Sequence, residues 1–222
     1  MLKKIITRGL LICVILMVAL CGYRFITHGS FFAKEVKIVE NWETALINSD
    51  NYISRDYVPE CTKLSNGEMV DEKIYPDLQE MFDAARADGV SITVRSGYRS
   101  YEEQKVLWKE EMDRLDEEGL SLHEAIKCGE LLVQRPGASE HQTGLAVDIN
   151  SEQGINEKEG LYRWLKENSY KYGFVLRYPE DKTDVTGIAN EPWHYRYVGK
   201  DAAETMVNEN LCLEEFIDAY NR

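Results

Sequence analysis

Two short segments carry the side chains of a candidate metal centre. His141 and Asp148 stand in the first segment, and Glu191 and His194 stand in the second. Two imidazoles and one carboxylate can hold a divalent ion and leave its fourth position open to water, as in catalytic zinc sites. Pro192 favours an extended Glu191, whose carboxylate could then act as a base on that water. These residue types in this arrangement indicate metal-assisted hydrolysis.

Each of these residues has an ordinary explanation when it is taken alone. His141 could be a surface-loop histidine, and Asp148 could be a strand acid in an ion pair. Glu191 could also be a fourth ligand that closes a structural site, although no place for water would then remain. His123 stands in a charged helical stretch and is not expected to bind the metal. Only the combination of residues favours a metal site.

The local sequence explains how the first segment could present its ligands. Residues 145–149 are expected to form a strand with Asp148 on one face and apolar side chains on the other. The apolar face can pack into the core while Asp148 points into a cleft. Gly144 permits a sharp turn that folds His141 back over the Asp148 face.

The rest of the sequence predicts the elements that position these segments. Apolar side chains recur with a helical period after Tyr75, and Ser100 with Glu103 forms a capping box that opens another helix. The pattern predicts an α+β domain with a small, mainly antiparallel sheet flanked by helices. The expected helices are 75–88, 100–115, 121–128, 157–172 and two short ones at the C-terminal end; the expected strands are 91–94, 145–149, 174–177 and 193–198; irregular segments are expected at 48–59, 133–144 and 179–186, and a stalk or first helix at 31–47.

Residues 1–34 have the layout of a membrane anchor or an export signal. A basic start is followed by an apolar run from Leu10 to Cys21, and these 34 residues contain five basic side chains and no acid. We expect an uncleaved anchor in the cell membrane, or secretion if it is cleaved, with residues 35–222 forming the catalytic domain outside the cytoplasm. The formal net charge of the whole chain is −13, so residues 35–222 carry −18, and a domain this acidic disfavours nucleic acid as a partner.

Three cysteines belong to the expected domain, namely Cys61, Cys128 and Cys212. An odd number cannot form a closed disulfide framework, and one disulfide at most could join two of them. Their spacing matches no metal motif, so structural roles are expected.

Three motifs stand out in this chain, and they are Ser96-Gly97-Tyr98-Arg99-Ser100 followed by Gln104, Ser139-x-His141-x-x-Gly144-x-Ala146-x-Asp148, and Glu191-Pro192-Trp193-His194. Together they resemble the motifs of a known family, the VanY-type D-alanyl-D-alanine carboxypeptidases. These are zinc peptidases of the group that also contains lysostaphin and the hedgehog fold. The resemblance runs from about residue 48 to residue 199 and keeps the order of the motifs.

The resemblance implies a hedgehog/D-Ala-D-Ala peptidase-like fold and a role for each motif residue. One Zn²⁺ per chain would be held by His141, Asp148 and His194, with Glu191 as the general base. Arg99 would bind a carbonyl or carboxylate of the peptide and stabilise developing negative charge. Other residues would contact the substrate or line its cleft, and these are Gln104, Ser139, Tyr98 and Trp193.

The expected activity is removal of the C-terminal D-alanine from peptidoglycan stem peptides or their precursors, either in routine wall maturation or in antibiotic (glycopeptide) resistance, which the sequence does not separate. The alternatives are an L,D-carboxypeptidase acting on stem tetrapeptides, a peptidoglycan endopeptidase, and a non-catalytic wall-binding module. Glu191 argues against the last of these, because a binding module has no need of a base beside its metal. The sequence contains no Ser-x-x-Lys motif, which excludes the serine acyl-enzyme route of penicillin-binding proteins.

Overall fold

The computed structural model describes residues 33–38, 41–151 and 158–220. The chain divides into two compact units, residues 1–34 and 35–222. The apolar segment expected to be an anchor lies outside the described residues, so its assignment stays a prediction. Within the described ranges, no helix has the length and apolar character needed to cross a membrane.

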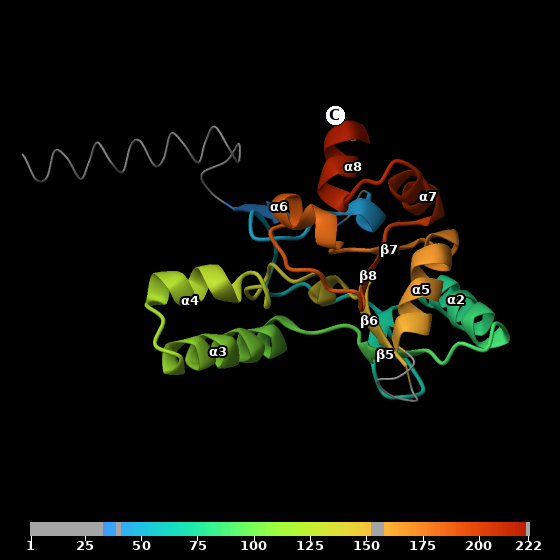
Figure 1. Cartoon of the computed structure of the whole chain (residues 1–222). Helices are drawn as coiled ribbons and strands as arrows, with labels where there is room; N and C mark the ends of the chain where they lie inside the picture. The colour runs from blue at the N-terminus through green and yellow to red at the C-terminus, as the bar shows by residue number, and fades with distance from the viewer. Residues whose placement is uncertain (1–32, 39–40, 152–157, 221–222) are drawn as a thin grey trace, which may run out of the picture. The chain divides into compact units, whose positions relative to one another are not determined.

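A four-stranded antiparallel sheet is the centre of the larger unit (Figure 1). Its strand order is β5-β6-β8-β7, so the last strand in the sequence is inserted between two earlier ones. The strands are β5 (Thr93–Ser96), β6 (Ala146–Asn150), β7 (Phe174–Leu176) and β8 (His194–Tyr197). Together with the flanking helices, this sheet confirms the expected α+β class.

The main core lies between one face of this sheet and the helices α2 (Tyr75–Ala87) and α5 (Lys158–Asn168). Figure 1 shows both helices on the same side of the sheet. From the strand region, Val147 and Ile149 are fully buried in this core, as the period-two pattern predicted. Burial of each such side chain stabilises the fold by about 1.5–3 kcal/mol. The opposite face of β6 is therefore left to Asp148.

Two helices run side by side beyond the edge of the sheet, α3 (Tyr101–Glu117) and α4 (Leu122–Gly129) (Figure 1). Each begins with a capping box. Ser100 accepts a hydrogen bond from the Glu103 backbone N–H while the Glu103 carboxylate accepts one from the Ser100 N–H, and Ser121 opens α4 in the same way. These side chains satisfy backbone N–H groups that the first helical turn leaves unpaired, which fixes where each helix starts.

The two short C-terminal helices predicted from the sequence are α7 (Lys200–Asn208) and α8 (Leu213–Tyr220). They pack against β7 in a second apolar cluster that contains Val175, Met206 and Phe216. This cluster ties the C-terminal end of the chain to the edge of the central sheet.

The N-terminal part of the domain differs from the prediction. A first helix was one expectation for residues 31–47, whereas the described part contains β1 (Lys34–Val36) and a single 3₁₀ turn, η1 (Trp42–Thr44). β1 and β2 (Asn51–Ile53) form a two-stranded sheet, and β3 (Cys61–Lys63) pairs with β4 (Met69–Asp71) in a hairpin that was not predicted. Strands of three residues are too short to show a period in the sequence.

Several boundaries also differ. The loops expected at 133–144 and 179–186 contain short helical turns, η2 (Glu140–Thr143), η5 (Glu180–Lys182) and α6 (Thr183–Thr186), which are too short to show a helical period in the sequence. The helix expected at 157–172 ends as α5 at Asn168 and continues as η4 (Ser169–Tyr172). The strand expected at 91–94 lies at 93–96, because its pairing with β6 starts at Thr93.

Candidate metal centre and active site

Two of the expected ligands face each other across the middle of the sheet. Asp148 of β6 lies opposite His194 of β8, and on its other side it lies opposite Ser96 of β5. Side chains directly opposite each other on antiparallel strands project from the same face, with Cβ atoms about 4.5–5.5 Å apart. The strand register therefore places Ser96, Asp148 and His194 in one row on the face away from the main core.

The third expected ligand, His141, comes from η2 and is brought to this row by a tight turn. Gly144 ends η2 with a φ of 73°, a left-handed conformation that favours glycine. A Cβ at this position would lie 2.8 Å from the backbone nitrogen of Asp71, which donates a hydrogen bond to the Gly144 carbonyl. No side chain fits this turn, which agrees with the sharp turn expected from the sequence.

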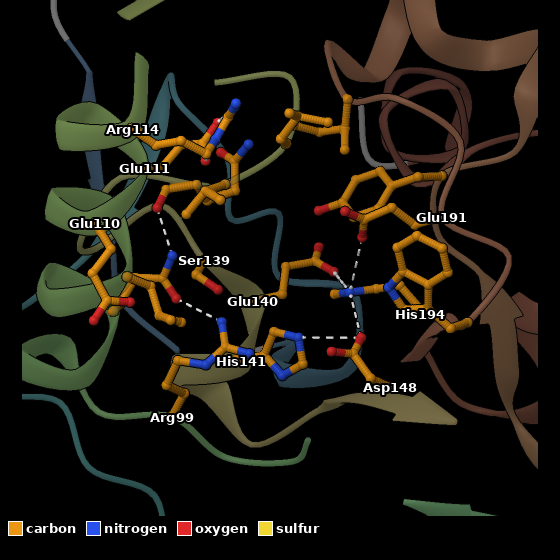
Figure 2. A pocket seen from close by; sticks show the side chains of 18 residues that line it. Arg99, Glu110, Glu111, Arg114, Ser139, Glu140, His141, Asp148, Glu191 and His194 are labelled. Carbon is orange, nitrogen blue, oxygen red and sulfur yellow. Dashed lines mark hydrogen bonds and ion pairs between the residues drawn. The ribbon is translucent and has the colours of Figure 1, made fainter. Parts of the chain in front are cut away.

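The donor atoms of these three residues converge (Figure 2). Asp148 Oδ1 lies 3.2 Å from His194 Nδ1 and 3.5 Å from His141 Nε2, and the three ligand atoms all lie within 4.8 Å of one another. His141 Nδ1 is 2.7 Å from the Gly97 carbonyl and donates its proton there, which leaves Nε2 free to bind a metal. Two imidazole nitrogens and one carboxylate oxygen form a donor set that suits zinc.

The carboxylate of Asp148 has an oxygen that a bound metal ion would satisfy. Its Oδ1 atom is buried and has no hydrogen-bond partner among the described residues. A buried carboxylate oxygen without a partner is costly unless a cation lies against it. Burial raises the pKa of Asp148, but the neighbouring rings of His141 and His194 outweigh that effect and hold the pKa well below its usual range. The site therefore presents an ionised carboxylate for a metal ion.

Glu191 lies at the edge of the same group. Its Oε2 atom is 3.5 Å from His194 Nδ1, and a turn in which the His194 N–H donates to the Glu191 carbonyl connects the two residues. Burial raises the pKa of Glu191 to about 7, although the charge of His194 opposes this rise. A carboxylate with a pKa near neutrality is suited to accept and return a proton.

The two histidine rings differ in their surroundings. Burial lowers the pKa of His141, with Asp148 acting in the opposite direction. Burial would also lower the pKa of His194, but its contacts with Asp148 and Glu140 raise it to about 9. Binding of a metal to His194 must therefore displace a proton from this ring.

Arg99 lies between the end of β5 and the start of α3, and it lines the same cavity as the ligand group. Its guanidinium donates to Ser96 Oγ and to Gln104 Oε1, both at 2.8 Å, and its backbone N–H donates to the His141 carbonyl. Burial lowers the pKa of Arg99, and nearby carboxylates led by Asp148 counteract this shift. Two of the five N–H donors of an arginine are engaged in these bonds, which fix the plane of the guanidinium.

Gln104 lies behind Arg99. Its side chain is 2 % exposed, and its Nε2 atom donates to the Gln134 carbonyl at 2.6 Å while its oxygen accepts from Arg99. Both ends of the amide are thus engaged within the protein. The structure places Gln104 as a support for Arg99 at the cavity wall.

One cavity of about 450 Å³ contains this whole arrangement. Ser139 is buried in its wall, and Trp193, which is 38 % exposed, also lines it. Tyr98 does not line this cavity and instead borders a separate surface hollow beside Arg99. Away from the metal ligands, the cavity continues between α3 and the segment after α4, where it is lined by Leu107, Glu110, Glu111, Arg114, Leu132 and Gln134.

Sequence reasoning missed a buried ion cluster beside His194. Glu140 Oε1 accepts from Arg177 Nε at 2.8 Å and from an Arg196 nitrogen at 2.9 Å, and all three side chains are almost fully buried. Arginines inside otherwise apolar strand segments are a signal that could have been used, because such charges must meet a buried acid. The sequence does not show which acid that is.

The remaining candidates lie apart from the site. His123 is on α4 and does not line the cavity, as expected. Cys61, Cys128 and Cys212 are free thiols, so the one disulfide that their number permitted does not form.

Comparison with known proteins gives a consistent result. The family model VanY, D-alanyl-D-alanine carboxypeptidase, matches residues 67–200. A D-alanyl-D-alanine carboxypeptidase of Enterococcus faecalis (strain ATCC 700802 / V583) is 48% identical over 186 residues, covering 84% of this chain and 69% of that protein. The putative carboxypeptidase YodJ of Bacillus subtilis (strain 168) is 38% identical over 213 residues, covering 85% and 75%.

Solved structures with the same fold include close relatives. VanYB in complex with D-alanine-D-alanine has a TM-score of 0.77 at 48% identity, covering 81% of this chain and 99% of that one. A variant of the vancomycin-resistance D,D-pentapeptidase VanY in complex with Zn(II) has a TM-score of 0.74 at 50% identity, covering 79% and 99%. The LD-carboxypeptidase LdcB has a TM-score of 0.71 at 35% identity, covering 84% and 90%.

Proposed function

The chain belongs to the VanY family of D-alanyl-D-alanine carboxypeptidases, and on that basis we propose how its residues share the work of the reaction. The protein is a zinc-dependent carboxypeptidase that removes the C-terminal D-alanine from peptidoglycan stem peptides or their precursors. The observation that supports the assignment of roles most strongly is the convergence of His141, Asp148 and His194 beside the carboxylate of Glu191.

The zinc ion would be held by His141 Nε2, Asp148 Oδ1 and His194 Nδ1. When bound, zinc acidifies a water molecule and polarises the carbonyl of the bond to be cut. His141 is already held in the tautomer that this role requires by its bond to the Gly97 carbonyl. Asp148 contributes the negative charge that offsets part of the charge of the ion.

Glu191 is the general base. It accepts a proton from the attacking water as the water oxygen bonds to the carbonyl carbon. It then delivers that proton to the amide nitrogen as the C–N bond breaks, so that D-alanine leaves with a neutral amine. Its raised pKa suits both transfers, since the group can gain and lose a proton near neutrality.

Arg99 binds the substrate. A guanidinium forms paired hydrogen bonds with a carboxylate, so it can hold the C-terminus of the peptide or the oxygen on which negative charge develops. Ser96 and Gln104 keep the guanidinium in one orientation. Ser139 and Trp193 line the cavity around the peptide and contribute contacts to it.

The N-terminal segment supports a location of the enzyme at the cell membrane. Residues 1–34 hold the enzyme at the cell membrane, with the catalytic unit on the outer side, where wall peptides are found. The basic start and apolar run of the sequence support this location. Fractionation of cells followed by N-terminal sequencing tests it: a soluble cytoplasmic protein with an intact Met1 would contradict it.

The activity is tested with defined peptides. The full chain with zinc should release D-alanine from a stem pentapeptide that ends in D-Ala-D-Ala, and much more slowly from the corresponding tetrapeptide. Preferential cleavage of the tetrapeptide would instead indicate L,D specificity. Cleavage of cross-linked peptide dimers to monomers would indicate an endopeptidase.

The roles are tested with variants in the same assay. Glu191→Gln should lose nearly all activity while it still binds one zinc ion, whereas His141→Ala and His194→Ala should each bind zinc weakly. His123→Ala is the matched control and should behave like the wild type. Loss of zinc from Glu191→Gln would make Glu191 a ligand, and binding of metal without cleavage of any peptide by the wild type would indicate a binding module.

A further inference from the structure

We propose that Glu140 is a positioning residue that orients His194 for zinc, and that the C-terminal helix α8 supports Glu140 through Arg177. This inference rests on the proposed role of His194 as a zinc ligand. It concerns Glu140, which lies beside His194 in the cavity wall, and the buried residues that contact Glu140.

Glu140 and His194 face each other, and each has an atom at this contact that makes no hydrogen bond among the described residues. Glu140 Oε2 and His194 Nε2 are 3.7 Å apart, both are buried, and neither has a hydrogen-bond partner among the described residues. Figure 2 shows the Glu140 carboxylate directed at the ring of His194. Asp148 lies against the other nitrogen of that ring, Nδ1. Because each atom lacks what the other can provide, a small rotation of the imidazole would join them in a hydrogen bond.

The direction of that bond decides which nitrogen of His194 is free. A neutral imidazole carries its proton on one nitrogen and offers its lone pair on the other. An ionised carboxylate can only accept a hydrogen bond, so Glu140 favours the tautomer with the proton on Nε2. Nδ1, which faces Asp148 and Glu191, is then left as the metal-binding atom.

Two arginines keep Glu140 ionised and in place. Arg177 and Arg196 both donate to Oε1, so the other oxygen is the one that remains for His194. Two guanidinium groups against one carboxylate favour its anionic form, because each brings a positive charge to hydrogen-bonding distance. Arg196 is itself fixed by the carbonyl oxygens of Glu43 and Ala45.

Arg177 carries the connection to the C-terminal helix. Its two terminal nitrogens donate to the two carboxylate oxygens of Glu214 on α8, at 2.8 and 2.7 Å, in the paired geometry that is most specific for arginine. Starting from α8, Glu214 therefore contacts Arg177, Arg177 contacts Glu140, and Glu140 contacts His194. Neighbours that orient a ligating histidine commonly change metal affinity by about 10–100-fold when they are replaced.

Glu140→Gln gives the sharpest test. The amide oxygen must stay with Arg177 and Arg196, because an amide nitrogen would place donor against donor. The NH₂ group then faces His194 Nε2 and favours a proton on Nδ1, where zinc should bind. We expect the zinc dissociation constant, measured by competition with a chelator, to rise by about 10–100-fold. The thermal unfolding of the metal-free variant shows whether its fold is retained.

A pair of neighbouring glutamates on α8 supplies the matched control. Glu214 pairs with Arg177, whereas Glu215 pairs with Lys182 and lies off this line of contacts. Glu214→Gln should weaken zinc binding several-fold, and Glu215→Gln should leave it unchanged. Equal effects of the two substitutions, or no effect of Glu214→Gln, would overturn the role of α8.

Two further measurements separate this inference from the proposed function. His194→Ala in the same competition assay tests the ligand itself: wild-type affinity there would remove the ligand assignment on which the inference depends. Nitrogen-15 NMR of the zinc-loaded wild type should show the His194 proton on Nε2 and the metal on Nδ1. The reverse arrangement, or wild-type zinc affinity in Glu140→Gln when His194→Ala has lost it, would overturn the role of Glu140.

Discussion

Asp148 and Glu191 are two carboxylates beside the same histidine, and their surroundings shift their pKa values in opposite directions. Asp148 lies against both imidazole rings, and its pKa is low despite burial. Glu191 lies farther from them, so burial dominates and its pKa rises to about 7. When the pKa values of two neighbouring acids differ in this way, the acid with the low pKa stays ionised and the acid with the raised pKa can accept and release a proton.

The raised pKa of Glu191 predicts a stability effect in the metal-free protein. A carboxyl group whose pKa is higher in the folded state favours folding when protonated, and that contribution is lost as the pH rises from about 4.5 to about 7. Glu191→Gln does not titrate. Its unfolding free energy relative to the wild type should therefore improve by about 2–3 kcal/mol between about pH 5 and pH 8, measured by urea unfolding. An equal difference at both pH values would contradict the shift.

Arg99 predicts a kinetic effect that depends on its shape. Arg99→Lys keeps a positive charge but cannot make both bonds to Ser96 and Gln104 while it holds a carboxylate. We expect kcat/KM for the pentapeptide to fall by about 10²–10³-fold. Gln104→Ala should lower it by roughly 10-fold, because the guanidinium keeps its charge and loses one support. Gln79→Ala, on α2 and outside the cavity that holds the metal ligands, is the control and should leave kcat/KM unchanged.

At the residue scale, the sequence predicts contacts between residues that are close together in the chain and misses contacts between residues that are far apart in it. The spacing around His141 and Asp148 is enough to predict their shared site, because one turn and one strand connect them. Glu140 is next to His141 in the same motif, yet its role depends on Arg177 and Arg196, which come from two other parts of the chain. Nothing in the local pattern shows that these charges meet.

At the scale of elements, the turn after η2 predicts a large effect from a single methyl group. Gly144 and Gly187 both end short helical turns with nearly the same φ, 73° and 72°. Alanine at Gly187 would meet nothing within 4 Å, whereas at Gly144 its Cβ would approach Asp71 to 2.8 Å. Gly187→Ala should cost about 1–2 kcal/mol of stability from the left-handed backbone alone. Gly144→Ala should cost distinctly more and also weaken zinc binding by moving His141.

Urea unfolding and zinc titration of both variants check this prediction. Equal losses of stability in the two variants would show that Asp71 moves away from the new methyl group without lowering the free energy of unfolding. Unchanged zinc affinity in Gly144→Ala would show that the turn does not hold His141 in place.

The elements themselves differ in how far the sequence predicts them. The starts of α3 and α4 follow from capping boxes that consist of residues three positions apart, so a local pattern is sufficient. The hairpin of β3 and β4 and the turns η2 and η5 are three or four residues long. Their positions depend on contacts such as that between Asp71 and Gly144, which join distant parts of the chain.

At the scale of the whole molecule, the metal site predicts that zinc stabilises the fold. An ion that binds only the folded chain raises the unfolding free energy by about 2.7 kcal/mol at a concentration one hundred times its dissociation constant. Calorimetry with zinc and with a chelator should show this difference as a higher Tm. His194→Ala should show no such rise, and a rise equal to that of the wild type would contradict the site.

The class of the fold could be predicted, but the strand order could not. Short periodic segments and turn residues are enough to indicate an α+β domain with an antiparallel sheet. The order β5-β6-β8-β7 depends on pairing between strands that lie far apart in the sequence. This order decides that Asp148 and His194 become neighbours.

The insertion of β8 between β6 and β7 has a consequence for the sequence of events in folding. Asp148 is synthesised before His194, with α5 and β7 between them. Pairings across such separations form slowly, because a long loop must close before any contact is gained. A chain that has not yet inserted its last strand therefore has no complete set of zinc ligands. Zinc uptake during refolding should coincide with closure of the sheet, and a half-finished chain is unable to cut peptides.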